Sequence, residues 1–267
     1  MRFGIFFMKK KQTVEYIVKW LNNYCETNGM RGFVIGVSGG IDSALTSALC
    51  AMTNKPTLLV EMPIHQAPSH VSRAQQHIAF LKKRFENVTS LQVELTTSFD
   101  TLVQALPPSD NEYLYNLSLA NTRARLRMTT LFYLAGTHRH LVAGTGNKIE
   151  DFGVGFFTKY GDGGVDLSPI ADLTKTEVYS LAESLGIHDD ILNAAPTDGL
   201  FGDDRSDEDQ LGASYPELEW AMAYIDNGEK ISKRERDVLD IYQKLNKQNQ
   251  HKMQPIPVCI IPEDLRT

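Results

Sequence analysis

Residues 36–43 read Gly-Val-Ser-Gly-Gly-Ile-Asp-Ser and directly follow the apolar run of residues 32–35. The pattern predicts a buried strand, a tight glycine-rich turn and a helix that begins near Asp42. Glycines let the backbone turn without a Cβ clash and approach a ligand closely. The first turn of a helix has unpaired N–H groups and a partial positive charge, which together bind phosphate. The segment therefore predicts a phosphate-binding loop; the alternative is a tight turn whose small residues serve packing alone.

This loop differs from the phosphate loop of kinases and GTPases, because that loop contains a lysine and this one does not. Ser38 and Ser43 supply hydroxyl donors instead. Asp42 would repel a bare phosphate, so it fits this position best as a ligand of a Mg²⁺ ion that the phosphate also binds. The Ser-Gly-Gly-Ile-Asp-Ser string resembles the pyrophosphate loop of the N-type ATP pyrophosphatases. That superfamily cleaves ATP between the α and β phosphates and transfers AMP to a carboxylate or carbonyl oxygen.

The composition narrows the class of protein. The 267 residues suit one large α/β domain, and 42% hydrophobic with 22% charged residues is typical of a globular chain. A net charge of −6 disfavours a nucleic-acid partner, because phosphate backbones are bound by clustered Lys and Arg. Three cysteines, Cys25, Cys50 and Cys259, form neither a Cys-x-x-Cys pair nor a metal-binding spacing. We therefore expect a reducing, cytoplasmic location.

The N-terminus is a short apolar run, residues 1–8, followed by Lys9, Lys10 and Lys11. It lacks the order of charges and the cleavage site of a signal peptide. We expect residues 1–9 to be an extension, either disordered or the product of an upstream start codon. No segment approaches the roughly 20 apolar residues that a membrane span needs, so we expect no membrane partner.

Helical and strand patterns alternate along the chain, which predicts an α/β fold. Helices are expected at about residues 10–27, 42–52, 69–86 and 112–135, and strands at 32–35, 57–62, 88–95 and 141–144. Capping boxes predict three further helices: Thr174 with Glu177, Ser214 with Glu217, and Ser232 with Glu235. We expect a doubly wound parallel sheet with helices on both faces, as one domain over residues 1–267. Residues 158–169 and 196–212 are predicted loops, equally consistent with a lid and with a solvated turn.

The second half of the chain carries motifs that separate the N-type ATP pyrophosphatases from one another. They are Gly144-Thr145-Gly146-Asn147-Lys148-Ile149-Glu150, Phe157-Thr158-Lys159-Tyr160-Gly161-Asp162-Gly163-Gly164-Val165-Asp166, Pro169-Ile170-Ala171-Asp172-Leu173-Thr174-Lys175, and His251-Lys252. Their order resembles the ammonia-dependent NAD synthetases, from about Val14 to Lys252. The resemblance implies a Rossmann-like fold of the adenine nucleotide alpha hydrolase type. It also implies a ligase that converts the nicotinate carboxylate of deamido-NAD into an acyl adenylate with ATP, and then into an amide with ammonia.

The same resemblance assigns roles to particular residues. ATP-binding positions are Gly36, Ser38, Gly39, Gly40, Asp42, Ser43, Thr145, Lys175 and Thr197, with Gln66 as a further candidate. Mg²⁺ ligands are Asp42 and Glu150, and deamido-NAD positions are Arg125, Lys159, Asp166, His251 and Lys252. Lys175 would offset charge as pyrophosphate departs, and Asp162 would attract ammonium and take its proton. The helix that carries Arg125 would form a homodimer interface.

Three departures from the family's pattern leave details open. Asp151 follows Glu150, so either acid could be the metal ligand. Glu61-Met62-Pro63 stands where many members have a basic residue before Leu-Pro, which leaves the adenine contact undetermined. The segment that resembles the family's mobile loop, from Pro196, is unusually acidic after Gly202.

Other activities fit the sequence less well. A glutamine-dependent synthetase needs an added amidohydrolase domain, for which a first helix beginning near residue 10 leaves no room. A tRNA-modifying relative would need a basic surface. A non-catalytic ATP-binding module of related fold would not need Asp42, Glu150, Lys175 and Thr197 together.

Overall fold

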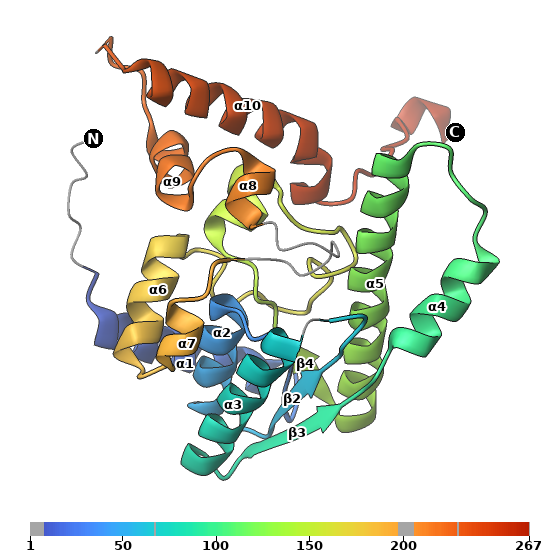
Figure 1. Cartoon of the computed structure of the whole chain (residues 1–267), viewed down its shortest axis with the longest axis vertical. Coiled ribbons are helices and arrows are strands. Elements are labelled where there is room, and N and C mark those ends of the chain that lie inside the picture. The colour runs from blue at the N-terminus through green and yellow to red at the C-terminus, as the bar shows by residue number, and fades with distance from the viewer. Residues whose placement is uncertain (1–7, 67, 197–205, 229, 267) are drawn as a thin grey trace.

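Four parallel strands form the centre of the computed structural model, which describes residues 8–66, 68–196, 206–228 and 230–266 (Figure 1). The strands lie in the order β3-β2-β1-β4. Their bounds are Gly32–Gly36 for β1, Thr57–Glu61 for β2, Val88–Gln92 for β3 and His140–Val142 for β4. Strand β1 is central: Phe33 is in register with Thr57 of β2 and with Leu141 of β4.

The chain winds outward in one direction and then returns to the other side of β1. Helix α2 (Ile41–Ala51) connects β1 to β2, and α3 (Pro68–Arg84) connects β2 to β3. Helices α4 (Thr96–Ala105) and α5 (Glu112–His138) then lead to β4. The strand order reverses between β1 and β4, and ligands of open α/β sheets bind beyond the carboxyl ends of the strands at such a point. The predicted phosphate loop and the segment after β4 both begin there.

Helices cover both faces of the sheet, as the sequence predicts. Phe33 and Ile35 of β1 pack in one hydrophobic cluster with buried residues of α1 (Lys10–Thr27), α2 and α6 (Lys175–Ser184). Val34 packs in a second cluster with Leu134 of α5 and Phe99 of α4. Successive strand residues point to opposite faces, so β1 contributes to both clusters.

A third cluster of buried residues lies apart from the sheet. It is formed by α8 (Asp207–Leu211), α9 (Tyr215–Ala223), α10 (Lys233–Met253) and the π-helical segment η1 (Ile149–Val154). Figure 1 places α8, α9 and α10 on the side toward which β2 and β3 point. The cluster therefore lies over the carboxyl edge of the sheet, where the candidate loops emerge.

The expected helices and strands are present with shifted ends, and the three predicted capping boxes are formed. One prediction was wrong and one helix was missed. Residues 196–212 were expected to be loop throughout, but α8 lies within them, because Ser206 and Asp209 make a capping box of their own. Helix α4 was not expected, and β3 ends at Gln92 instead of residue 95. The two remaining short helices are α7 (Asp189–Leu192) and η2 (Glu263–Leu265).

Within the described residues, no helix is both long and apolar enough to cross a membrane.

Candidate active site

The predicted phosphate loop is a tight turn held by its own hydrogen bonds. Gly39 has φ +84°, a left-handed conformation that glycine adopts without a Cβ clash. The backbone N–H of Ser38 donates to Ser43 Oγ over 3.3 Å, and Gly40 N–H donates to Ser38 Oγ over 3.2 Å. Ser43 Oγ donates to Gly40 O over 3.0 Å. No side chain caps the amino end of α2, so its first N–H groups are open to an anion.

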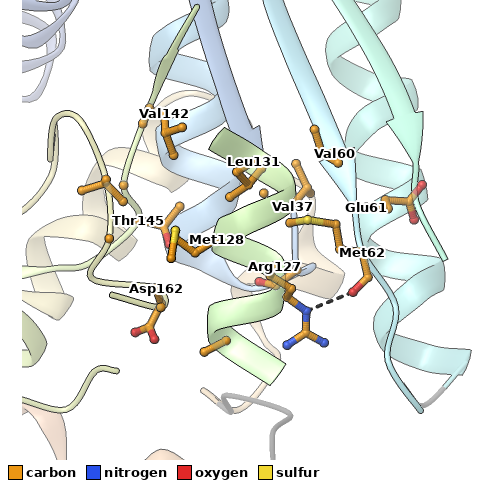
Figure 2. Close-up of a pocket in the computed structure, with 18 of the residues that line it drawn as sticks. Val37, Val60, Glu61, Met62, Arg127, Met128, Leu131, Val142, Thr145 and Asp162 are labelled. Carbon is orange, nitrogen blue, oxygen red and sulfur yellow. Dashed lines mark hydrogen bonds between the residues drawn. The ribbon is translucent and has the colours of Figure 1, made fainter. Parts of the chain in front are cut away.

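A first cavity of about 250 Å³ begins where β1, β2 and β4 end and runs along α5. Figure 2 shows Met128 and Leu131 of α5 facing Val37 and Met62, an apolar lining suited to a flat ring. Arg127 lies at the edge of this cavity. It donates to Met62 O over 3.0 Å and to Gln66 Oε1 over 3.0 Å.

A second cavity of about 150 Å³ adjoins the first, and Ser38, Gln66, Thr145 and Asp162 line both. Most residues predicted to bind ATP or metal meet in this cavity, whereas Gly36 lies in the first. The predicted residues in its lining are Ser38, Gly39, Gly40, Asp42, Ser43, Gln66, Thr145, Glu150, Asp162 and Lys175. Thr197 lies outside the described residues.

Lys175 joins the two predicted metal ligands. Its Nζ lies 2.7 Å from Asp42 Oδ2 and 3.0 Å from Glu150 Oε1, and only 4% of its side chain is exposed. Burial alone would lower the pKa of Lys175, but the charges of Asp42 and Glu150 outweigh it and raise the pKa. The ammonium therefore stays charged. For Asp42, burial raises the pKa and Lys175 counters that rise.

Two residues that the sequence did not single out hold this cluster. Asn147, which is fully buried, donates to Asp42 Oδ1 over 3.1 Å and accepts from the backbone N–H of Glu150 over 3.2 Å. Tyr215 donates its hydroxyl to Glu150 Oε1 over 2.6 Å, and burial beside carboxylates raises the pKa of that phenol far above its ordinary value. Arg73 is a third addition, because its Nε donates to Gly39 O over 3.4 Å at the edge of the second cavity.

Asp162 is an exposed residue that lines both cavities. Its Oδ1 accepts from the backbone N–H of Thr158 over 3.0 Å. Desolvation of its carboxyl by the surrounding protein atoms raises the pKa of Asp162 to about 6, and Glu150 adds to the rise while Thr158 and Lys252 oppose it. A carboxylate with such a pKa can accept a proton near neutral pH.

Asp151 differs from Glu150 in what it faces. Its carboxylate lies against Gly146, where a Cβ would collide with it. Burial, followed by the charges of Glu150, Asp162 and Asp42, raises the pKa of Asp151 to about 8. Glu150, and not Asp151, accepts from the ammonium that it shares with Asp42.

The residues predicted to hold deamido-NAD lie outside both cavities. Four of them form a connected group between α5 and α10. Arg125 Nε donates to Lys159 O over 3.3 Å, and Lys159 Nζ donates to His251 O over 2.7 Å. Lys252 Nζ donates to Phe157 O over 2.8 Å.

Asp166 is separate from that group. Its Oδ2 accepts from the backbone N–H of Val142 over 2.8 Å, and its own backbone N–H donates to Val142 O over 3.0 Å. In this structure the side chain therefore fixes the end of β4.

Comparison with known proteins shows the family of this chain. A family model described as NAD synthase matches residues 13–256. The chain belongs to the NAD synthase family. An NH(3)-dependent NAD(+) synthetase of Carboxydothermus hydrogenoformans is 35% identical over 243 residues, which are 91% of this chain and 94% of that protein. One of Mesoplasma florum is 36% identical over 229 residues, 85% of this chain and 90% of that protein.

Solved structures of NAD synthase relatives share the fold. An NMN synthetase of Francisella tularensis has a TM-score of 0.81 at 28% identity and covers 95% of this chain and 98% of its own. An NH3-dependent NAD synthetase of Campylobacter jejuni has a TM-score of 0.76 at 24% identity, covering 95% of this chain and 100% of its own. Membership of the family confirms the resemblance found in the sequence, and the Rossmann-like class is confirmed with it.

The donor set of the second cavity fits the Mg²⁺ ion that the family resemblance implies. Mg²⁺ is usually held by one or two carboxylates together with phosphate oxygens and water. Asp42 and Glu150 provide two such carboxylates beside the open amino end of α2. No group of three or more His, Cys, Asp or Glu arranged for a metal occurs among the described residues.

Proposed function

We propose that this chain amidates deamido-NAD to NAD with ATP and free ammonia, releasing AMP and pyrophosphate. It is a ligase of the NAD synthase family. The observation that carries the proposal is the convergence of the open α2 terminus, Lys175 and Asp162 on one cavity at the strand-order reversal.

In the first step, the carboxylate oxygen of deamido-NAD attacks the α phosphorus of ATP and pyrophosphate leaves. The N–H groups of the loop and the hydroxyls of Ser38 and Ser43 bind the leaving phosphates. Lys175 supplies a cation beside them, and its position at the first turn of α6, where a cation opposes the helix dipole, is explained by that role. Bound Mg²⁺ would neutralise phosphate charge, with Asp42 and Glu150 as its protein ligands.

In the second step, ammonia attacks the acyl carbon and AMP leaves with the electron pair of the broken C–O bond. Asp162 binds ammonium and accepts its proton, which yields the nucleophilic ammonia. Its position between the cavities and its pKa of about 6 support this role. Arg125, Lys159, His251 and Lys252 are proposed contacts of the nicotinate nucleotide, and the first cavity is proposed to hold adenosine.

One assay tests the reaction. The purified protein is incubated with ATP, Mg²⁺, ammonium and deamido-NAD, and NAD, AMP and pyrophosphate are measured. Equal amounts of the three products are expected. ADP in place of AMP, or absence of NAD, would refute the proposal.

A second candidate substrate is the acid mononucleotide that corresponds to NMN. The observation in its favour is the 0.81 TM-score of the structure described as an NMN synthetase. Running nicotinate mononucleotide and deamido-NAD in competition decides between them, and we expect kcat/KM to favour deamido-NAD.

We further propose a homodimer that pairs through α5. Only four of the 27 residues of this helix are buried, and Tyr113, Leu114 and Tyr133 are 67%, 52% and 70% exposed. Size-exclusion chromatography with light scattering tests it: a monomer that still turns over would contradict the dimer. A cytoplasmic location, proposed from the soluble substrates, is tested by cell fractionation.

A further inference from the structure

Tyr215 contacts two groups that the proposed reaction needs. Its hydroxyl lies 2.6 Å from Glu150 Oε1, and the same oxygen accepts from Lys175 Nζ over 3.0 Å. The Lys175 ammonium lies 4.6 Å from the centre of the Tyr215 ring. A phenol has a single proton to donate, so the short bond to Glu150 takes it and Asp207 Oδ2, at 3.4 Å, is the weaker acceptor.

The position of Tyr215 is fixed by the chain around it. Tyr215 is the first residue of α9, directly after the capping box of Ser214 and Glu217, and its side chain is buried. Its backbone N–H donates to Glu208 Oε1 over 2.9 Å. Arg234 of α10 pairs with Glu217 over 2.7 Å. The phenol is therefore held on a rigid element and not on a free loop.

Lys175 and Tyr215 both donate to Glu150, but they differ in how they would affect a metal ion bound there. Lys175 is itself a cation and competes with any metal for Glu150 and Asp42. Tyr215 is neutral, so it orients the carboxylate without repelling a divalent ion. Once Lys175 turns toward phosphate, Tyr215 is the remaining side-chain donor to Glu150 among the described residues.

We propose that Tyr215 is a positioning residue for the magnesium site, acting by holding Oε1 of Glu150. The inference rests on the proposed function and on its assignment of Glu150 as a metal ligand. Removing a group that orients a metal ligand in this way lowers metal affinity about 10- to 100-fold.

The test is Tyr215→Phe, which removes the hydroxyl and keeps the ring. Mg²⁺ binding is measured by calorimetry in the presence of an ATP analogue with a methylene bridge between the α and β phosphorus atoms. We expect the Mg²⁺ dissociation constant to rise about 10- to 100-fold. The melting temperature without Mg²⁺ and the metal-free affinity for the analogue are expected to stay close to wild type. Tyr242→Phe, a matched change at a half-buried tyrosine of α10 in the same cluster, is expected to change Mg²⁺ affinity less than about twofold.

A double-mutant cycle separates action through Glu150 from a general structural effect. In a Glu150→Gln background, adding Tyr215→Phe is expected to raise the Mg²⁺ dissociation constant less than twofold above that of Glu150→Gln alone. Wild-type Mg²⁺ affinity in Tyr215→Phe, or the same weakening in both backgrounds, overturns the inference. If the wild-type protein with analogue binds no Mg²⁺, the metal site fails and this inference fails with it. Formation of NAD from deamido-NAD is assayed separately, so the failure of the proposed reaction is distinguishable.

Discussion

Replacing Lys175 with Met should test the charge balance of the site most directly. The Lys175 side chain is 4% exposed, and its partners Asp42 and Glu150 are 17% and 15% exposed. Removing one partner of a buried ion pair costs about 3–5 kcal/mol, because the charge left behind stays buried and unpaired. At about 2–4 °C per kcal/mol for a chain of this size, we expect Lys175→Met to lower Tm by roughly 6–20 °C at pH 8.

The loss of stability in Lys175→Met should become smaller as pH falls from 8 to 5. In the wild type, burial opposes the charge of Lys175, but Asp42 and Glu150 raise its pKa above the ordinary 10.5. The ammonium is therefore charged in both states from pH 5 to 8, and its stabilising contribution is constant over that range. In the variant, Asp42 keeps the burial that raises its pKa and loses the cation that lowers it. Its folded state then binds a proton as pH falls, so the variant regains stability toward pH 5.

Thermal unfolding followed by circular dichroism at pH 5, 6, 7 and 8, with a chelator present, measures both effects. Lys148→Met is the matched control, because Lys148 Nζ lies 2.9 Å from Asp172 while these side chains are 37% and 96% exposed. An exposed pair contributes about 0–1 kcal/mol, so the control should melt within a few degrees of wild type. A loss for Lys175→Met no larger than for the control, or equal at every pH, would refute the reasoning.

Three further predictions concern single residues. Asp162→Asn should slow attack by ammonia more than formation of the adenylate in single-turnover experiments, and equal slowing of both steps would leave Asp162 structural. Wild-type amidation should slow as pH falls through about 6, since desolvation of the carboxyl raises the pKa of Asp162 to that value. Asp42→Ala should abolish pyrophosphate release dependent on deamido-NAD at ordinary Mg²⁺ concentrations, and unchanged turnover would remove its metal role. Burial lowers the pKa of His77 from 6.5 to about 4, so the folded state favours the neutral ring. The contribution of His77 to the free energy of unfolding should therefore be complete above pH 6.5 and fall by about 3 kcal/mol toward pH 4. His77→Gln should flatten that part of the Tm profile, and a profile parallel to wild type would contradict the assignment.

The fold could be predicted because its signals are local. The strand before Gly36, the open glycine turn and the capping box of Thr174 with Glu177 each depend on neighbouring residues, and each is present. Helix α8 was missed for a related reason. Its capping box uses Asp209 where Glu or Gln is usual, inside a run of acids that reads as a solvated turn.

The partners of the site residues could not be predicted, because they come from distant parts of the chain. Tyr215 reaches Glu150 across 65 positions, and nothing in the sequence around it distinguishes it from a core tyrosine. Arg125 and Arg127 are two positions apart on α5, so they point in different directions, and periodicity alone did not say which one borders the cavity. The structure assigns that place to Arg127.

The absence of lysine from the phosphate loop and the acidity of the cavity have one physical explanation. Among the described residues that line the second cavity, the cations are Lys175 and Arg73, while Asp42, Glu150, Asp151, Asp162 and Asp207 are acids. A tetra-anionic nucleotide entering this lining alone would meet net repulsion. On the proposed function, a divalent ion held by Asp42 and Glu150 would offset this repulsion, and Lys175 would then be available to phosphate. Coupling between two ligands is reciprocal. If the metal raises the affinity for ATP by some factor, ATP raises the affinity for the metal by the same factor. On the proposed function, the carboxylates that disfavour a bare phosphate would thereby make nucleotide binding conditional on the metal.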